Sequence, residues 1–324
     1  MRVVLCNEFG PLDQLSIEER PAAHCGERDV RIGVTAAGLN FVDALFVQGL
    51  YQIKPPLPFV PGNEIAGVVT QVGAAVSNFA VGDRVLANVG LGGYASEVVV
   101  DARRVVATPA NLTDGQAATF TQSYMTAWFA LHHRANAQPG QWLLVLGAGG
   151  GVGLAAVDVG RAMGLRVIAV ASTPAKRQAA LDRGAEAVID STTQDVKTVA
   201  REIADGDGVD LVYDPVGGAA GELALRTLRE DGQFIVIGFA SGDIPKLPAN
   251  QVLLRNRRVT GVDWGAWVGR NQVANHEMML AVLGEIANGT LSPVEPVTYP
   301  LEQAAQALQD QLDRKITGKA ALVP

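Results

Sequence analysis

The chain has 324 residues, of which 48% are hydrophobic, 18% are charged and 36 are glycines. These totals describe a compact folded protein and exclude a disordered or fibrous one. Acidic residues outnumber basic ones by 33 to 26, and the basic residues are scattered, so the chain lacks the positive stripe that a nucleic acid requires. A chain of this length usually divides into about two domains.

The cysteines and the apolar segments indicate where the protein works. Cys6 and Cys25 are too few for a disulfide framework or a thiolate zinc site and are typical of a reducing compartment, so we expect the cytoplasm. The N-terminal residues run directly into Glu8 and Asp13 and lack the apolar core of a signal peptide. The longest apolar stretch, residues 142–160, is broken by the glycines of 147–153, which argues against a membrane span.

The pattern of predicted secondary structure changes near residue 120. Residues 1–120 contain short β segments, among them 30–34, 65–69 and 96–100, separated by Gly, Pro and Asp, and they predict an irregular β-barrel domain. From residue 121, strand-like runs alternate with helical stretches, which predicts a parallel, doubly wound sheet. The strand-like runs are 143–146, 167–171, 187–189, 211–213 and 234–237.

The last segment changes character again. It has a helical pattern at 278–287 and at 301–312, and it ends in a strand-like 320–323. We expect this segment to fold back onto the first domain. No internal repeat or low-complexity tract interrupts the two domains.

A glycine-rich turn follows the strand predicted at 143–146. In the register of the G-x-G-x-x-G pattern, Ala148, Gly150 and Gly153 take the three small positions, and a helix begins near Gly151 and Val152. Small residues let the backbone approach a pyrophosphate, and the helix directs unpaired N–H groups and its positive end at the phosphates. A tight strand-to-helix turn packed against its neighbours would use the same residues, but the context favours dinucleotide binding.

The end of the second strand of this domain indicates which dinucleotide binds. An NAD site usually places Asp or Glu there, about twenty residues after the glycines. Here the strand ends in Ser172 and Thr173, followed by Pro174, Lys176 and Arg177, with no acid in this segment. A hydroxyl and two cations suit a 2′-phosphate, so NADPH is favoured over NADH. Thr173 and Pro174 are also an ordinary helix start, and the two cations also suit a solvated helix face.

Six segments together resemble the quinone oxidoreductase branch of the medium-chain dehydrogenase/reductase superfamily, and the resemblance covers nearly the whole chain. They are 37–43, 61–67, 81–85, the glycine turn, 208–218 and 238–242. The resemblance implies a GroES-like catalytic domain at 1–122, completed by 266–324, and a Rossmann NADPH-binding domain at 123–265. It also implies an active site in the cleft between them and a homodimer.

The same resemblance assigns further residues to the coenzyme. Val216 belongs to a loop beside the coenzyme, Phe239 and Ser241 lie near the nicotinamide, and Val262 and Trp264 approach it. Arg314 occupies a position like that of a family arginine near the adenosine phosphate. Ser191 departs from the family, where a tyrosine often stacks near the adenine.

Zinc-dependent alcohol dehydrogenases of the superfamily carry a metal-binding Cys where this chain has Asn40 and a His where it has Asn63. Glu64 remains, but one carboxylate cannot replace the three protein ligands of a catalytic zinc. The histidines, at 24, 132, 133 and 276, show no ligand spacing. We therefore expect no metal. Without a Lewis acid a simple ketone is a poor substrate, whereas a conjugated acceptor spreads the charge of the incoming hydride into an enolate or quinol oxygen.

Three side chains are candidates for contacting that acceptor. Tyr51 resembles the proposed proton donor of mitochondrial-type enoyl thioester reductases, a sister branch, and it also suits an aromatic lid over the coenzyme. Asn40 suits a coenzyme or substrate contact, or a satisfied turn residue. Thr126 suits a contact to the carboxamide, or helix capping.

The leading prediction is an NADPH:quinone oxidoreductase, with the coenzyme and one small-molecule substrate as its ligands. An enoyl-CoA or alkenal reductase using the same residues is the second prediction, because substrate identity depends on pocket walls. A non-catalytic NADPH-binding protein, in the manner of lens zeta-crystallin, is the third.

Overall fold

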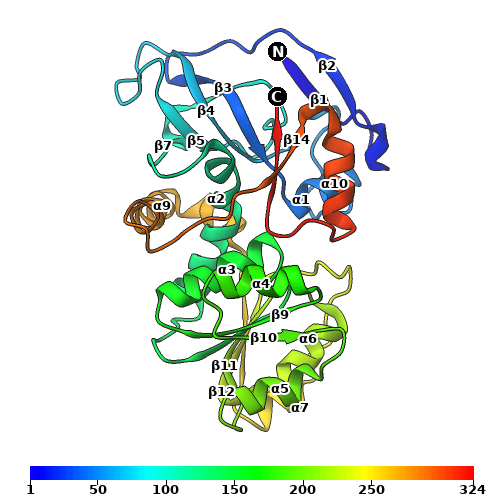
Figure 1. Ribbon diagram of the computed structural model, residues 1–324. Helices are drawn as coiled ribbons and strands as arrows, with labels where there is room; N and C mark the ends of the chain where they lie inside the picture. Colours follow the sequence, from blue (N-terminus) through cyan, green and yellow to red (C-terminus); the bar gives the residue numbers. More distant parts are fainter. The chain divides into compact units, whose positions relative to one another are not determined.

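The computed structural model describes residues 1–324, and they form two compact units (Figure 1). The first contains residues 1–122 and 294–324, and the second contains residues 123–293. Residues 266–293, which the sequence assigned to the first domain, group with the second unit. Ser292 N donates to Asp158 Oδ2 at 2.8 Å, and Arg161 donates to the carbonyl of Thr290. These bonds hold the segment, and the domain limits inferred from sequence remain a prediction.

The first unit is built on a seven-stranded sheet with the order β14-β15-β3-β4-β5-β7, in which β6 also pairs with β3. Along β3, side chains from Val30 to Val34 are alternately buried and half-buried, which places the valines and Ile32 in the core. The last strand pairs antiparallel with β3 and so completes this sheet. The strands are β3 (Asp29–Gly38), β4 (Glu64–Val72), β5 (Arg84–Asn88), β6 (Glu97–Asp101), β7 (Val105–Ala107), β14 (Val297–Pro300) and β15 (Ala320–Val323).

Smaller elements flank this sheet. The ribbon of β1 (Arg2–Leu5) and β2 (Ser16–Glu19) is antiparallel. Helix α1 (Phe41–Val47) begins at a capping box, in which Asn40 and Asp43 each bond to the other's backbone. Helix α10 (Ala304–Leu312) packs beside α1, and its buried Ala307 and Leu308 join the core of the unit.

The second unit is a six-stranded parallel sheet with the order β10-β9-β8-β11-β12-β13. This order reverses direction between β8 and β11, and ligands of such sheets bind outside the carboxyl ends of the strands at that point. The sequence predicted five of the six strands and missed β13, a short edge strand with mostly exposed residues. The strands are β8 (Trp142–Val145), β9 (Arg166–Ala171), β10 (Ala187–Asp190), β11 (Val209–Asp214), β12 (Leu228–Val236) and β13 (Arg258–Gly261).

Helices connect these parallel strands, as a doubly wound sheet requires. Helix α4 begins where Thr173 Oγ1 accepts from Lys176 N, with Pro174 at the first helical position. The connecting helices are α3 (Gly151–Ala162), α4 (Pro174–Asp182), α5 (Val196–Ile203), α6 (Gly218–Ala224) and α7 (Ala249–Leu253). Helix α2 (Asp114–Trp128) precedes β8, and α8 (Trp264–Arg270) and α9 (Gln272–Ala287) follow β13. The predicted α/β fold, with a β-sheet domain and a doubly wound parallel-sheet domain, is confirmed.

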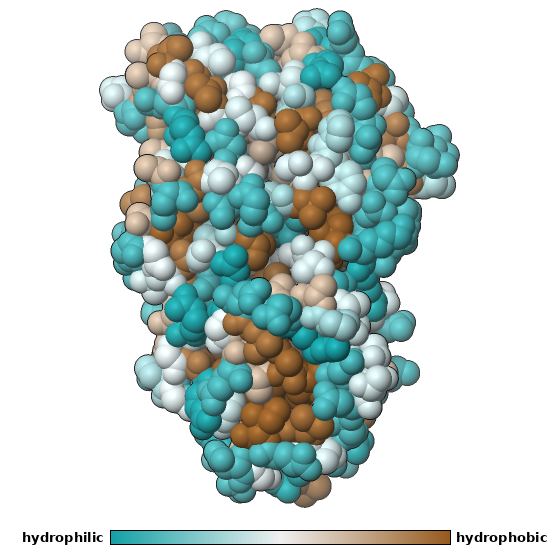
Figure 2. Space-filling view, in the orientation of Figure 1, coloured by the Kyte–Doolittle hydropathy of each residue, from teal (hydrophilic) through white to brown (hydrophobic).

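The second unit has an apolar core and also an apolar patch on its surface. The second unit buries a cluster that includes Leu144, Ile168 and Val212 under its helices. Figure 2 shows hydrophobic residues gathered over the part of this unit where β10, an edge strand, is drawn in Figure 1. No helix combines the length and the apolar character that crossing a bilayer requires.

Candidate active site

The glycine turn has the close packing that its sequence predicts. Gly147 has φ 59°, and Gly150 caps helix α3. A β-carbon built on Gly153 would lie 2.3 Å from the carbonyl oxygen of Gly147, so the helix and the turn touch through backbone alone. A β-carbon on Gly150 would meet only that same oxygen, at 3.6 Å. Gly150, Gly151 and Val152 are half-buried, so the first turn of α3 remains accessible to a pyrophosphate.

Lys176 lies directly over this turn. A β-carbon on Gly149 would come within 2.4 Å of Lys176 Cβ and 2.7 Å of its Cδ. The aliphatic part of the lysine therefore crosses the glycine backbone, which places its ammonium group near the turn. Ser172 and Thr173 are exposed at the same strand end. The structure thus brings a hydroxyl pair and a cation to the end of β9, beside the predicted pyrophosphate turn.

Arg177 has a different environment from the one that its sequence position suggested. Its Nη1 lies 3.0 Å from Asp190 Oδ2 and donates to the carbonyl of Ala171 at 3.3 Å. Because parallel strands end at the same edge of a sheet, the last residue of β10 lies opposite Ala171. The sequence prediction considered only the end of β9 and therefore missed this acid.

Loops after two further strands, β11 and β12, meet at the same edge. Val216, after β11, would contact a β-carbon on Gly147 at 2.9 Å. Its N–H and that of Gly217 donate to Asp214 Oδ1, each at 2.9 Å, while Asp214 Oδ2 has no hydrogen-bond partner; burial raises the pKa of Asp214. Ser241, after β12, donates its N–H to the carbonyl of Val216 at 2.8 Å. The two loops therefore form one surface.

The remaining predicted coenzyme residues vary in accessibility. Phe239 is 38% exposed, which leaves a ring face available to a ligand. Val262 is half-buried beyond the end of β13, and its N–H donates to the carbonyl of Val236 at 3.1 Å. Trp264 is only 7% exposed and donates from Nε1 to Asn275 Oδ1 at 3.0 Å. Trp264 is thus an interior residue.

A buried polar cluster occupies the first unit around Glu64. Lys319 Nζ, on the segment before β15, lies 3.1 Å from Glu64 Oε1 and donates to Asn40 Oδ1 at 2.7 Å and to the carbonyl of Leu39 at 3.0 Å. Asn40 Nδ2 donates to Glu64 Oε1 at 2.8 Å and to Asn63 Oδ1 at 3.0 Å. Both amide hydrogens of Asn40 are therefore in use, which is the arrangement of a positioning residue.

Asp43 lies beneath this cluster. Asp43 Oδ2 accepts from Asn40 N and from the hydroxyl of Tyr94, each at 2.8 Å, while its Oδ1 has no hydrogen-bond partner. Burial is the main cause that raises the pKa of Asp43 to about 7; the hydrogen bonds from Asn40 and Tyr94 oppose the increase, and the charges of Glu64 and Lys319 make smaller contributions, upward and downward respectively. Burial also raises the pKa of Tyr94, so its hydroxyl stays protonated at neutral pH and donates to Asp43.

The residues around Glu64 do not fit a zinc ion. No group of three or more His, Cys, Asp or Glu residues is placed to hold a metal. Glu64 Oε1 is paired with the Lys319 ammonium, and Glu64 Oε2 accepts from Gln122 N at 2.9 Å. A second cation at this carboxylate would be repelled by the first and would lack thiolate or imidazole ligands.

The two other catalytic candidates and the coenzyme candidate Arg314 are divided between the two units. Tyr51 follows α1 and is half-buried, with its ring centroid 4.8 Å from that of Phe46. Thr126 belongs to the part of α2 in the second unit and is 8% exposed. Arg314 belongs to the first unit, is exposed after α10 and has φ 59°. The roles of these three residues stay predictions.

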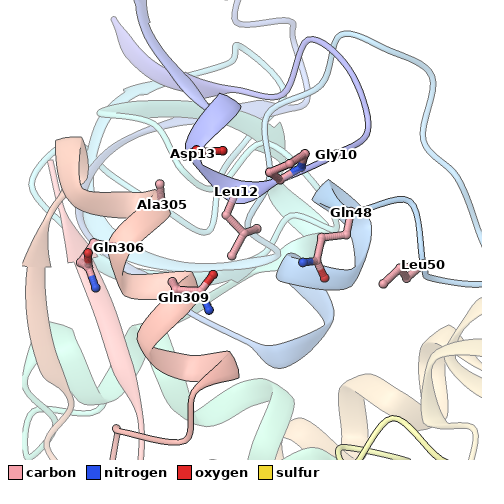
Figure 3. Close-up of a pocket in the computed structure, with 9 residues that line it drawn as sticks. Gly10, Leu12, Asp13, Gln48, Leu50, Ala305, Gln306 and Gln309 are labelled. Carbon is pink, nitrogen blue, oxygen red and sulfur yellow. The ribbon is translucent and has the colours of Figure 1, made fainter.

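A cavity of about 580 Å³ opens in the first unit (Figure 3). Gly10, Leu12 and Asp13 form one side of it, Gln48 and Leu50 follow the end of α1, and α10 contributes the rest of the labelled residues. Its lining is mainly amide and aliphatic and includes none of the predicted site residues. Leu50 connects this cavity to Tyr51 along the chain.

Comparison with known proteins agrees with this architecture. The model of the alcohol dehydrogenase GroES-like domain matches residues 26–110, and the model named zinc-binding dehydrogenase matches residues 151–281. A quinone oxidoreductase-like protein 2 homolog of Nematostella vectensis is 39% identical over 99% of this chain and 88% of its own length. The chain belongs to the quinone oxidoreductase-like family of the medium-chain dehydrogenases/reductases. It is an oxidoreductase, as its sequence predicted.

Three solved structures are similar over at least 99% of both chains. Mycobacterial Rv1454c complexed with NADPH has a TM-score of 0.91 at 29% identity. Escherichia coli quinone oxidoreductase complexed with NADPH has a TM-score of 0.89 at 29% identity. The CurK enoyl reductase has a TM-score of 0.88 at 27% identity.

Proposed function

We propose that this oxidoreductase transfers a hydride from NADPH to an electron-poor conjugated acceptor, with a quinone as the first candidate. The observation that carries the coenzyme part is Lys176, whose side chain crosses Gly149 in the pyrophosphate turn. The coenzyme is NADPH, the one bound in two solved relatives. Its nicotinamide supplies the hydride when it is bound.

The second unit has residues suited to each part of that coenzyme. Ala148, Gly150 and Gly153 bring the backbone close to the pyrophosphate, and Gly151 and Val152 present the N-terminus of α3. Ser172, Thr173 and Lys176 bind the 2′-phosphate. Val216, Phe239, Ser241 and Val262 line the nicotinamide side at the carboxyl ends of β11, β12 and β13, with Trp264 beneath them as support. Arg314 adds a cation at the adenosine phosphate.

The acceptor must accept a hydride without help from a metal. We infer zinc independence from Glu64, whose carboxylate is already neutralised by Lys319 and hydrogen bonded by Asn40. A simple carbonyl would then develop alkoxide charge with no Lewis acid to stabilise it, whereas a quinone delocalises this charge. Tyr51 supplies the proton to the developing quinol oxygen, Thr126 contacts the carboxamide, and Asn40 positions the site through Glu64.

An enoyl-CoA or alkenal reductase is the alternative, because the structure of the CurK enoyl reductase is also similar. Both reactions deliver hydride to a conjugated carbon, so the same residues serve either. A protein that binds NADPH without turnover is the third possibility in this series. Which acceptor is reduced, if any, distinguishes these three possible functions.

The experiment is steady-state oxidation of NADPH against a panel of quinones, enals and enoyl-CoA esters, with and without a zinc chelator. The proposal expects turnover with quinones that is unaffected by the chelator. Turnover only with enoyl thioesters would replace the quinone by the alternative. Coenzyme binding with no turnover on any acceptor would favour the binding protein, and loss of activity on chelation would remove zinc independence.

We also propose a homodimer that pairs through the free edge of β13. This strand ends the sheet, Val259 on it is 44% exposed, and Leu253 before it is 75% exposed. Sedimentation of the wild type and of Val259→Lys tests this proposal, and a monomeric wild type contradicts it. A cytoplasmic location stays a prediction from the cysteine content.

A further inference from the structure

An acidic side chain stands beside the proposed 2′-phosphate site. Asp190 is the last residue of β10 and lies opposite Ala171, the last residue of β9. Ser172, the proposed phosphate hydroxyl, is the next residue along the chain. In NAD-dependent folds of this type, a carboxylate at the end of the second strand, which is β9 here, binds the ribose 2′-hydroxyl. Asp190 brings a carboxylate to the same edge from the neighbouring strand. Left alone, Asp190 would favour NADH and repel the phosphate dianion of NADPH.

Arg177 cancels this charge. Its Nη1 lies 3.0 Å from Asp190 Oδ2, and the side chains of both residues are about one-fifth exposed, at 18% and 20%. The same Nη1 donates to the carbonyl of Ala171, which ties the guanidinium to the end of β9. Asp190 Oδ1 accepts from the backbone N–H of Thr192 at 2.8 Å and from its hydroxyl at 2.6 Å. The carboxylate is thus fixed in place, and its second oxygen is reserved for Arg177.

Lys176 and Arg177 have separate tasks although they are adjacent. Successive helical residues point about 100° apart, so the two side chains cannot both face one phosphate equally well. Lys176 lies over Gly149, whereas Arg177 reaches across to β10. Lys176 therefore stays beside Ser172 and Thr173 at the proposed 2′-phosphate site, whereas Arg177 faces an acid.

We propose that Arg177 determines coenzyme specificity as a positioning residue, by neutralising Asp190 rather than by touching the phosphate. This inference rests on the proposed use of NADPH. A single exposed charge near a dianion changes its binding by about tenfold at the effective dielectric of a protein surface. The Arg177–Asp190 pair therefore acts as a unit, and its effect disappears when both charges are removed together.

A double-mutant cycle tests the pair. Arg177→Met, Asp190→Asn, the double variant and Lys176→Ala are compared with the wild type. Binding of NADPH, of NADH and of adenosine 2′,5′-bisphosphate is measured by titration, and thermal unfolding is followed for each protein. The bisphosphate isolates the phosphate end from the nicotinamide end.

We expect R177M to weaken NADPH and bisphosphate binding about tenfold while leaving NADH unchanged or tighter. The double variant returns NADPH binding to within about twofold of the wild type, because the neutral pair repels nothing. D190N alone keeps or tightens NADPH binding. This last variant retains Arg177 and so tests the charge even if R177M folds poorly.

A double variant as weak as R177M would overturn the proposal in favour of direct phosphate contact. Equal weakening of NADPH and NADH in R177M, with a lower melting temperature, would reduce the pair to a structural clamp and also overturn it. A wild type without preference for NADPH removes the proposed coenzyme and this inference together. If K176A abolishes the preference for NADPH over NADH and none of the Arg177 and Asp190 variants changes it, only this inference is removed.

Discussion

The side chain of Lys176 crosses the backbone of Gly149, with its Cβ within 2.4 Å of the position that a β-carbon on the glycine would take. Two residues from different strand–helix connections thus form one surface at the end of β8 and β9. This contact explains why Gly149 must lack a side chain. It also sets the first prediction.

Lys176→Ala is expected to raise the Michaelis constant for NADPH about ten- to hundredfold and to leave that for NADH nearly unchanged, because a charge-assisted contact to the 2′-phosphate is lost. Lys197→Ala, on helix α5 and similarly half-buried, is the matched control. Steady-state kinetics with both coenzymes measures the difference. Equal changes for the two coenzymes would contradict the phosphate assignment.

Gly153→Ala tests the contact between helix α3 and the turn. The added methyl would meet the Gly147 carbonyl oxygen at 2.3 Å, so we expect destabilisation of about 1–3 kcal/mol and weaker NADPH binding. Gly284→Ala in α9 is the control, because nothing lies within 4 Å of its β-carbon position. It should stabilise the protein by about 0.5–1 kcal/mol through helix propensity. Thermal unfolding measures both, and a neutral G153A would show that the turn can widen.

Lys319→Met leaves the buried Glu64 without its cation. We expect a loss of about 3–5 kcal/mol in the free energy of unfolding, measured by urea denaturation. The double variant Lys319→Met with Glu64→Gln should recover most of this loss, because no unpaired charge remains. Lys315→Met, whose side chain is 58% exposed, should change stability by only about 0–1 kcal/mol. A double variant as unstable as K319M would mean that packing, not charge, dominates.

Asp43 makes stability depend on pH in a defined direction. Burial raises the pKa of Asp43 from 3.8 to about 7, so its stabilising contribution is complete below the unfolded pKa and is lost as the pH rises to 7. The free energy of unfolding should therefore fall across that window, by up to about 4 kcal/mol from this group. Asp43→Asn should flatten the profile, whereas Asp207→Asn, at an exposed residue, should not. An unchanged slope in D43N would refute the assignment.

Tyr51→Phe tests the proton donor. If the hydroxyl protonates the acceptor, kcat should fall by about ten- to hundredfold or more, while the Michaelis constant for NADPH stays the same. The variant keeps an aromatic ring that packs on Phe46, so a role as an aromatic lid alone would leave kcat unchanged. Intact turnover with altered coenzyme affinity would end the proton-donor role.

Local patterns predicted much of the second unit. The strand-turn-helix context of Gly150 and Gly153 and the period of the strands are short-range signals, and they predicted five of the six strands. β13 was missed because its four residues are largely exposed and lack an apolar pattern. Residues 266–293 were grouped differently because their bonds to Asp158 and Arg161 cross more than a hundred residues.

The two charge pairs, Arg177–Asp190 and Lys319–Glu64, could be recognised only from the folded structure. Asp190 lies opposite Ala171 only through strand register, which a single sequence does not contain. Lys319 meets Glu64 from 255 residues away, and the segment before β15 gave no sign of a buried cation. The identity of Asn40 and Asn63 did predict the absence of zinc ligands, but the cation beside Glu64 was found only in the structure.

The position of Lys319 also bears on how the protein is made. The strand that follows it, β15, completes a sheet whose other members lie mostly within the first 107 residues. On the ribosome the N-terminal residues emerge long before this strand. Glu64 therefore has no Lys319 to pair with while the whole second unit is synthesised. The second unit is continuous in sequence and can fold first, whereas the first unit completes its core last, although most of it is synthesised earlier.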